Sequence, residues 1–130
     1  MQDFRKLRVW EKSHQMALEI YRRTGSFPDS EMYGMTSQMS RAAVSIPANI
    51  AEGCGRSSSA DFGRFLHIAL GSACELEYFL ILARDLEYRE PSAYDNVSET
   101  LIAIKQMISA LLSRIRNCDD DRILKPTTDN

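Results

Sequence analysis

The chain has 130 residues, of which 44% are hydrophobic and 26% are charged, and its formal net charge is −2. This composition is typical of a soluble globular protein, and the length fits one domain with one core. The charge offers nucleic acid no general attraction, and because the sequence has neither a signal core nor a run of about 18 apolar residues, we expect a cytoplasmic protein without a membrane span.

The first predicted helix runs from about residue 7 to residue 24. Apolar residues recur along it at helical spacing in two adjoining stripes. Its basic face is mild evidence for an anionic partner, but a solvated face or a surface that docks on an acidic subunit explains it equally well. The candidate nucleic-acid-binding residues on and just before this helix are Lys6, Arg8, Lys12, Arg22 and Arg23.

The second predicted helix runs from about residue 31 to residue 54, after a break in which Gly25 caps the first helix and Pro28 prevents its continuation. Pro47 lies inside this second helix. A proline there removes one backbone donor and crowds the carbonyl group of Ala43, at a cost of about 3 kcal/mol. We therefore predict a kink at Pro47.

A polar stripe follows the same helix in steps of three and four residues: Gln38, Arg41, Ser45, Asn49, Glu52 and Arg56. In one interpretation Pro47 bends the helix around its own bundle, and Asn49 and Glu52 bond the freed backbone groups or an arginine. In the other, the stripe belongs to a subunit interface, with Glu52 paired to an arginine of its own or another chain. The arginines considered are Arg41, Arg56 and Arg64.

The third and longest predicted helix runs from about residue 58 to residue 86. Ser58 and Asp61 resemble a capping box at its start. In its middle, Gly71 and Ser72 leave a notch, and Glu75 and Glu77 follow. A mid-helix glycine costs up to about 1 kcal/mol relative to alanine, so its presence suggests a packing demand.

The fourth predicted helix begins near Pro91 and has an apolar seam that extends from Tyr94 to Ile115. Short loops between four amphipathic helices predict an all-α fold, a single antiparallel up-down-up-down four-helix bundle. We assign residues 1–118 to this domain. Residues 119–130 lose the apolar pattern and are predicted to form a flexible tail.

Catalytic and metal sites find little support in the sequence. The cysteines Cys54, Cys74 and Cys118 are odd in number and widely spaced, which argues against a disulfide framework or a zinc site. A di-iron bundle requires two Glu-x-x-His pairs on facing helices. Glu11 stands three residues before His14, but Arg64 stands three residues before His67, so the chain has no second pair. The segment "GCGRSSS" is a weak candidate for an anion site, but it lacks the lysine of a P-loop. We expect a protein that is not an enzyme, with no cofactor, no metal and no small-molecule substrate.

The motifs "FP..E.YG", "RAA.SIP.NIAEG" and "IA.GS..ELE" resemble those of the 23S rRNA intervening sequence (S23) family of four-helix bundle proteins. The resemblance implies a ring-like homopentamer. Family members are often encoded within insertions in ribosomal RNA genes, and a related branch, the accessory protein of diversity-generating retroelements, binds nucleic acid and a reverse transcriptase. The matching signature positions, none of them an established catalytic residue of the family, are Arg41, Pro47, Asn49, Glu52, Gly53, Arg56, Gly71, Ser72, Glu75 and Glu77.

The chain departs from this pattern in two respects. Glu87 stands where relatives usually have a glycine before the tyrosine after the third helix, and the chain lacks the strongly basic character of the retroelement branch. The sequence therefore favours a non-enzymatic oligomeric scaffold or adaptor for another macromolecule. The alternative is an RNA-binding protein that uses the basic face of the first helix, repeated around the oligomer.

Overall fold

The computed structural model describes residues 2–25, 27–31, 34–88 and 92–124, without the side chains of residues 31, 92, 93 and 118–124. Four α-helices make up the fold: α1 (Arg8–Thr24), α2 (Met35–Cys54), α3 (Ser59–Asp85) and α4 (Ser92–Leu124). Short 3-10 helices, η1 (Phe4–Lys6) and η2 (Asp29–Glu31), precede α1 and α2. These residues contain no strand, which confirms the all-helical prediction.

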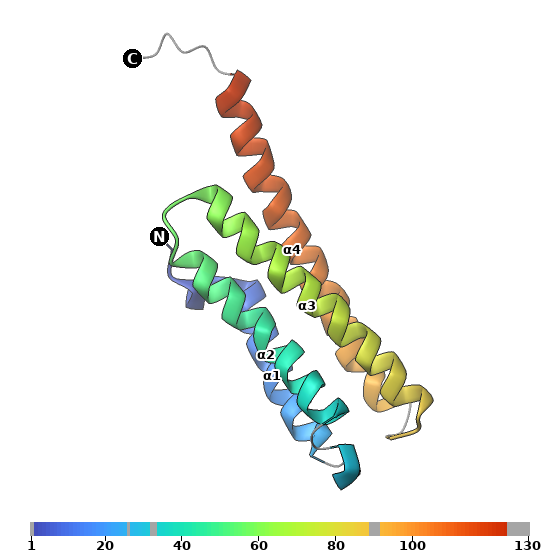
Figure 1. Cartoon of the computed structure of the whole chain (residues 1–130). Coiled ribbons are helices and arrows are strands. Elements are labelled where there is room, and N and C mark those ends of the chain that lie inside the picture. Colours follow the sequence, from blue (N-terminus) through green and yellow to red (C-terminus); the bar gives the residue numbers. More distant parts are fainter. Residues whose placement is uncertain (1, 26, 32–33, 89–91, 125–130) are drawn as a thin grey trace.

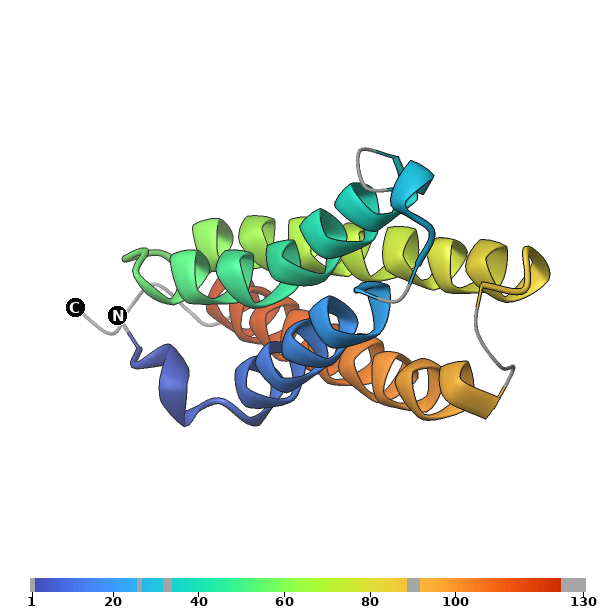
Figure 2. The same ribbon diagram turned by 90° about the horizontal axis from the view of Figure 1, so that it is seen from below.

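Consecutive helices lie side by side, and the chain reverses direction at each connection (Figure 1). α2 packs on both α1 and α3, while α4 packs on α3 and returns to α1 (Figure 2). α2 is helical without interruption from Met35 to Cys54, although it contains Pro47. The kink at Pro47 stays a prediction.

Local side-chain chemistry explains where several helices begin. The hydroxyl of Ser58 accepts a hydrogen bond from the backbone N–H of Asp61 at 3.1 Å, so the predicted cap at the start of α3 is confirmed. The carboxylate of Asp3 accepts a hydrogen bond from the backbone N–H of Arg5 at 3.1 Å and so caps η1. This bond and the side-chain bond from the same arginine lower the pKa of Asp3.

α2 begins four residues later than the sequence pattern predicts, at Met35 rather than near residue 31. Residues 29–31 form the separate turn η2 instead of a first helical turn. Gly34, at the N-cap position of α2, has φ −102° and ψ −108°, which is not a helical conformation. The backbone at this glycine therefore separates η2 from α2.

The end of α3 is closed by a left-handed turn at Glu87, whose φ is 58°. The N–H of Tyr88 donates to the carbonyl oxygen of Ala83 at 3.1 Å, and the N–H of Glu87 donates to that of Arg84 at 3.0 Å. This bond pattern is a Schellman motif, whose left-handed residue is usually glycine. Glu87 thus occupies a conformation that costs a side-chain-bearing residue roughly 1–2 kcal/mol.

α4 extends to Leu124, six residues beyond residue 118, where the predicted bundle domain ends. No glycine or proline interrupts the sequence until Pro126, and a residue directly before proline disfavours helical backbone. The loss of apolar periodicity after residue 118 therefore does not end the helix. The flexibility predicted for residues 125–130 lies outside the described residues.

The core lies along the inner sides of all four helices, where Ile46, Leu66 and Ile104 are fully buried. Among the described residues, three polar side chains are buried, Ser13, Thr24 and Ser40, and the first two each donate to a carbonyl oxygen of their own helix. Ser13 donates to Trp10 at 2.9 Å, and Thr24 donates to Ile20 at 2.8 Å. Burial of these hydroxyls therefore leaves neither donor unsatisfied.

α3 is more apolar than burial in this fold requires. By length and composition alone, α3 could cross a membrane, but the core helix of a soluble protein passes the same test. Only 33% of its most apolar 18-residue window is buried within the chain. Much of the apolar surface of α3 therefore faces outward.

Candidate functional site

A chain of polar contacts joins α2 to α3 at the middle of the predicted stripe. The hydroxyl oxygens of Ser45 and Ser72 lie 2.8 Å apart. The side-chain amide of Asn49 donates to the hydroxyl of Ser45 at 2.9 Å and to its carbonyl oxygen at 2.7 Å. Because the hydroxyl of Ser45 accepts from Asn49, its own proton is available to Ser72.

The contact of Asn49 differs from the first sequence-based interpretation, whereas the partner of Glu52 is one that both interpretations allowed. Asn49 bonds the carbonyl group of Ser45, not the carbonyl of Ala43 that Pro47 leaves without its helical donor. Glu52 pairs with Arg56 of its own chain at 3.2 Å. The side chains of Arg56 and Glu52 are 43% and 55% exposed, so the pair contributes only a few tenths of a kcal/mol, about 0.3–0.5.

Two arginines cover the ring of Phe65, a residue of α3: Arg56, which follows the end of α2, and Arg64 of α3. The guanidinium groups of Arg56 and Arg64 lie 4.9 and 4.5 Å from the centre of its ring. Arg64 also lies 3.7 Å from the carboxylate of Asp61. Phe65 is only 6% exposed, so the arginines help cover a ring at the edge of the core while keeping their charges in water.

Gly53 permits the close approach of α2 and α3 beside this ring. A Cβ atom at Gly53 would lie 2.9 Å from the ring of Phe62 and 3.0 Å from Cβ of Phe65. Gly71, in the middle of α3, has no atom within 4 Å of a Cβ built on it. Packing within the chain therefore explains Gly53 but not Gly71.

The remaining signature residues do not share one surface. Pro47 and Gly53 are buried, whereas Arg41 and Glu75 are exposed. Glu77 points toward α4, where Lys105 donates to its carboxylate at 2.9 Å. The sequence analysis listed Glu75 and Glu77 together. In the structure they point in different directions, because residues two positions apart lie on different faces of a helix.

Large apolar side chains lie exposed on α2 and α3. Val44, Ile68, Tyr78 and Ile81 are 40%, 42%, 58% and 43% exposed. Ile68, Gly71, Glu75 and Tyr78 follow helical steps along one side of α3. We call Arg41, Val44, Ile68, Gly71, Glu75, Tyr78 and Ile81 the outer face.

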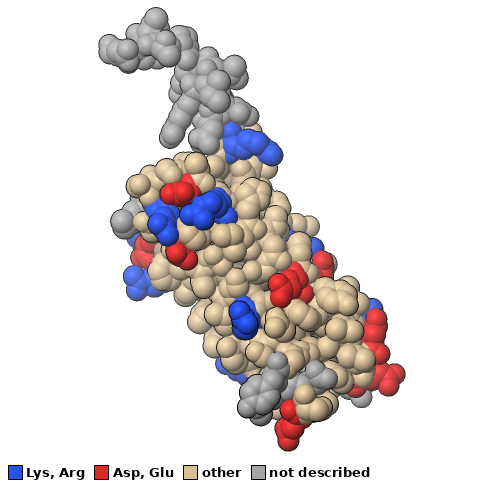
Figure 3. Space-filling model, viewed as in Figure 1, with Lys and Arg blue, Asp and Glu red and all other residues tan. Residues whose placement is uncertain are grey.

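Uncharged side chains cover most of the visible side of the molecule on which α2 and α3 lie (Figure 3). Sequence reasoning missed the apolar part of the outer face because Ile68, Tyr78 and Ile81 sit in a helix that is apolar on several sides. The signal that could have revealed it was the excess of apolar residues in α3 over the number that one buried stripe needs.

The basic residues of α1 line a groove of about 800 Å³ between α1 and α4. It brings together four of the five candidate nucleic-acid-binding residues, Arg8, Lys12, Arg22 and Arg23, with Glu11 and Glu19 among them. Lys6 belongs to η1 and does not line this groove.

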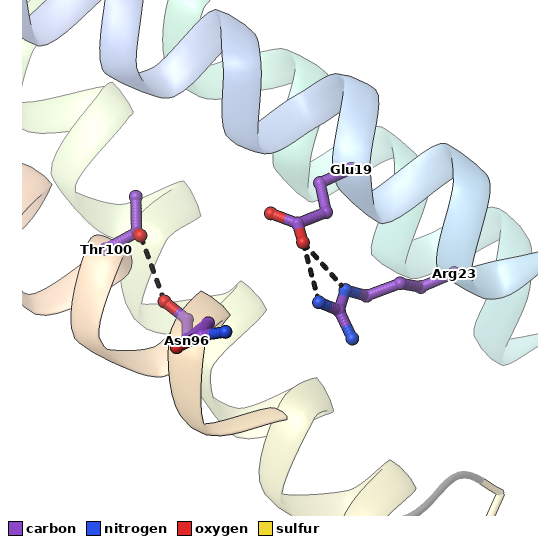
Figure 4. A network of polar contacts seen from close by, with 4 residues as sticks. All are labelled: Glu19, Arg23, Asn96 and Thr100. Carbon is purple, nitrogen blue, oxygen red and sulfur yellow. Dashed lines mark hydrogen bonds and ion pairs between the residues drawn. The ribbon is translucent and has the colours of Figure 1, made fainter. Parts of the chain in front are cut away.

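An ion pair within α1 reduces the positive charge that this groove offers. Arg23 donates to the carboxylate of Glu19 at 2.6 and 3.1 Å (Figure 4). On α4, the hydroxyl of Thr100 donates to the carbonyl oxygen of Asn96 at 2.9 Å (Figure 4). Arg8, Lys12 and Arg22 remain as the groove's principal cations.

The histidines and the two described thiols lie in separate surroundings. The ring of His14 stacks on Trp10, with centroids 5.0 Å apart and planes at 10°. Cys54 is buried, and this burial raises the pKa of its thiol, while Cys74 is exposed. The part of the chain that the structure describes contains no group of three His, Cys, Asp or Glu residues able to hold a metal ion.

Comparison with known proteins identifies the family of this all-helical chain. Residues 5–110 match the family model of the 23S rRNA-intervening sequence protein. The chain therefore belongs to this family. A search of curated proteins gave no match.

A solved structure agrees with this assignment. It is the crystal structure of a protein of unknown function from Bacteroides thetaiotaomicron, described as a member of the S23 ribosomal protein family. The two folds are similar, with a TM-score of 0.73 and 31% sequence identity. The similarity covers 80% of this chain and 97% of the Bacteroides chain.

Proposed function

We propose that the chain is a non-enzymatic cytoplasmic scaffold that assembles into a ring-like homo-oligomer through its outer face and presents a repeated surface to another macromolecule. The observation that carries the proposal is the row of exposed apolar side chains on α3, above all Ile68 at 42% and Tyr78 at 58%. Contact with a second copy removes this apolar surface from water, which stabilises the assembly by about 25 cal/mol per Å².

Gly71 supports the same assignment. A glycine in the middle of a helix costs about 0.5–1 kcal/mol relative to alanine. Nothing within the chain lies near enough to require its missing side chain. Its place between Ile68 and Tyr78 fits an interface in which a helix of another copy approaches the backbone of α3 closely.

The charges of the outer face are also suited to association. Arg41 and Glu75 are exposed, and no ion pair among the described residues uses either of them. Opposite charges on one face pair between copies when the contact is head-to-tail. Repetition of such a contact closes a ring when the rotation between neighbouring copies permits closure, and the family resemblance implies five subunits.

Solution mass tests the proposal. Ile68→Glu should lower the mass measured by light scattering toward that of one chain, with helical content retained in circular dichroism. Ile102→Glu on α4 is the matched control, because Ile102 is 46% exposed but lies outside the outer face, and it should leave the mass unchanged. A wild-type chain that stays monomeric at high concentration, or an equal effect of both variants, would overturn the proposal.

RNA binding is the second candidate function, and the groove between α1 and α4 favours it because Arg8, Lys12 and Arg22 gather there. Such a role would also fit the resemblance to retroelement accessory proteins. Phosphate contacts predict an affinity that falls steeply as salt rises. Replacing Arg8, Lys12 and Arg22 by glutamate should abolish binding of a single-stranded RNA probe, while Lys6→Glu outside the groove should weaken it only slightly. Equal losses would remove the groove from this function.

A further inference from the structure

A second groove, of about 700 Å³, lies between the first half of α3 and the last part of α4. Apolar side chains of Leu70, Leu112 and Ile115 line it, together with the cationic or protonatable side chains of Arg64, His67 and Arg116. Among the side chains that the structure describes, no aspartate or glutamate lines the groove, although Arg64 also lies 3.7 Å from Asp61. The groove therefore suits a segment that is both acidic and apolar.

The end of α4 has the complementary composition. Its last residues are Asp119, Asp120, Asp121, Arg122, Ile123 and Leu124. Carboxylates near the C-terminus of a helix oppose the helix dipole. The backbone at the end of α4 extends past the connection between α2 and α3, beyond the rest of the bundle (Figure 1).

We propose that residues 119–124 of one copy dock in the groove between α3 and α4 of another copy. The inference rests on the proposed homo-oligomer and adds a contact separate from the outer face. The carboxylates of the segment pair with Arg116 and Arg64 of the receiving copy, and Ile123 and Leu124 cover its Leu112 and Ile115. The family match ends at residue 110, so this contact uses a segment beyond the matched region.

The dimensions allow this contact between copies but not within one copy. Residues 59–70 of α3 extend over about 17 Å at about 1.5 Å per residue, and residues 119–124 need only about 9 Å. Within one chain, α4 is a continuous helix from the groove to Leu124, so its end leads away from the groove that it lines. Asp119 and Asp120 do follow Arg116 by three and four residues, the spacing of ion pairs within a helix. A test must separate these two pairings.

Charge exchange between two variants distinguishes pairing between copies from pairing of Arg116 within its own helix. One variant carries His67→Glu and Arg116→Glu in the groove, and the other carries lysine at residues 119, 120 and 121. Each alone should have a lower mass by light scattering than wild type, because groove and segment then repel each other. An equimolar mixture should have a higher mass than either variant alone, because each segment then meets a groove of opposite charge in the other variant. Full wild-type mass is not required, since two variants cannot alternate completely around a ring of five. Arg84→Glu, at the far end of α3, is the control and should keep the wild-type mass.

The outcomes distinguish this inference from the proposed function. Unchanged mass in both variants overturns the docking. Assembly through the outer face is then still tested separately by Ile68→Glu. Lower masses that the mixture does not raise indicate pairing of Arg116 within its own helix and also overturn the docking. A monomeric wild type overturns both. Should a reversed variant lose helical content, Arg116→Gln and asparagine at residues 119–121 replace the reversals, and unchanged mass of both again rejects the docking.

Discussion

The hydroxyl of Ser45 in α2 lies 2.8 Å from the hydroxyl of Ser72 in α3, and Asn49 donates to the same Ser45 hydroxyl. A helix carrying a proline and a helix carrying a mid-helix glycine are thus joined by a polar bond between small side chains. A neutral hydrogen bond of this kind contributes about 0.5–1.5 kcal/mol to stability. It also fixes how far the two helices can slide along each other.

Removing either hydroxyl of this pair should cost nearly as much as removing both. Ser45→Ala and Ser72→Ala should each lower the free energy of unfolding by about 0.5–1.5 kcal/mol, because each breaks the same bond. The loss in the double variant should be smaller than the sum of the two single losses by about 0.5 kcal/mol or more. Urea unfolding of the four proteins measures it, and strictly additive losses would contradict the contact.

Gly53 and Gly71 should respond to alanine in opposite directions. Gly53→Ala places a methyl group 2.9 Å from the ring of Phe62, so it should lower the free energy of unfolding by about 1–3 kcal/mol. Gly71→Ala meets no atom and should raise chain stability by about 0.5–1 kcal/mol. Thermal unfolding compares them directly, and a destabilising Gly71→Ala in a monomeric sample would contradict this account. A loss of mass in Gly71→Ala with helicity retained would support the outer face as an interface.

Apolar periodicity and the positions of helix-breaking and capping residues predicted the helices well, because those signals are local. Gly25, Pro28 and Ser58 marked their boundaries, and α1 begins within one residue of its predicted start. Two boundaries were wrong for physical reasons. α2 begins only after Gly34, whose backbone is not helical. α4 continues past its apolar seam because no glycine or proline follows the seam before Pro126.

Glu87 should be a site at which glycine stabilises the chain. Glu87→Gly relieves the left-handed φ of 58° and should raise the free energy of unfolding by about 1 kcal/mol. Glu87→Ala is the matched control, since alanine removes the same charge without relieving the backbone, and it should give little gain. Thermal unfolding distinguishes them, and equal gains for both would assign the effect to charge.

The two described thiols should differ in reactivity. Cys74 is exposed, whereas Cys54 is buried, and burial raises the pKa of its thiol, so less reactive thiolate is present at a given pH. Brief treatment with iodoacetamide at pH 8 should label Cys74 well before Cys54, as read from peptide masses. In denaturant the two should react alike. Faster labelling of Cys54 in the folded protein would contradict its place in the core.

The candidate site was harder to predict than the helices because its partners are distant in sequence. Spacing along α2 placed Ser45 and Asn49 on one stripe, but no local pattern could name Ser72 as the partner of Ser45. The pair of Glu77 with Lys105 likewise joins α3 to α4. Nor does apolar periodicity separate Ile68 and Tyr78, which face outward, from the buried residues of the same helix, since all are compatible with a core.

The contact of α4 with α1 has a consequence for the order in which the molecule folds. α1 with α2, α2 with α3 and α3 with α4 are neighbours in both sequence and space, so each pair can form as a hairpin without waiting for a distant segment. The contact between α4 and α1 joins the first and last helices, which are distant in sequence, so we expect it to form last. Amide hydrogens along this seam should then exchange through partial opening, while those of α2 and α3 should exchange only when the whole molecule unfolds.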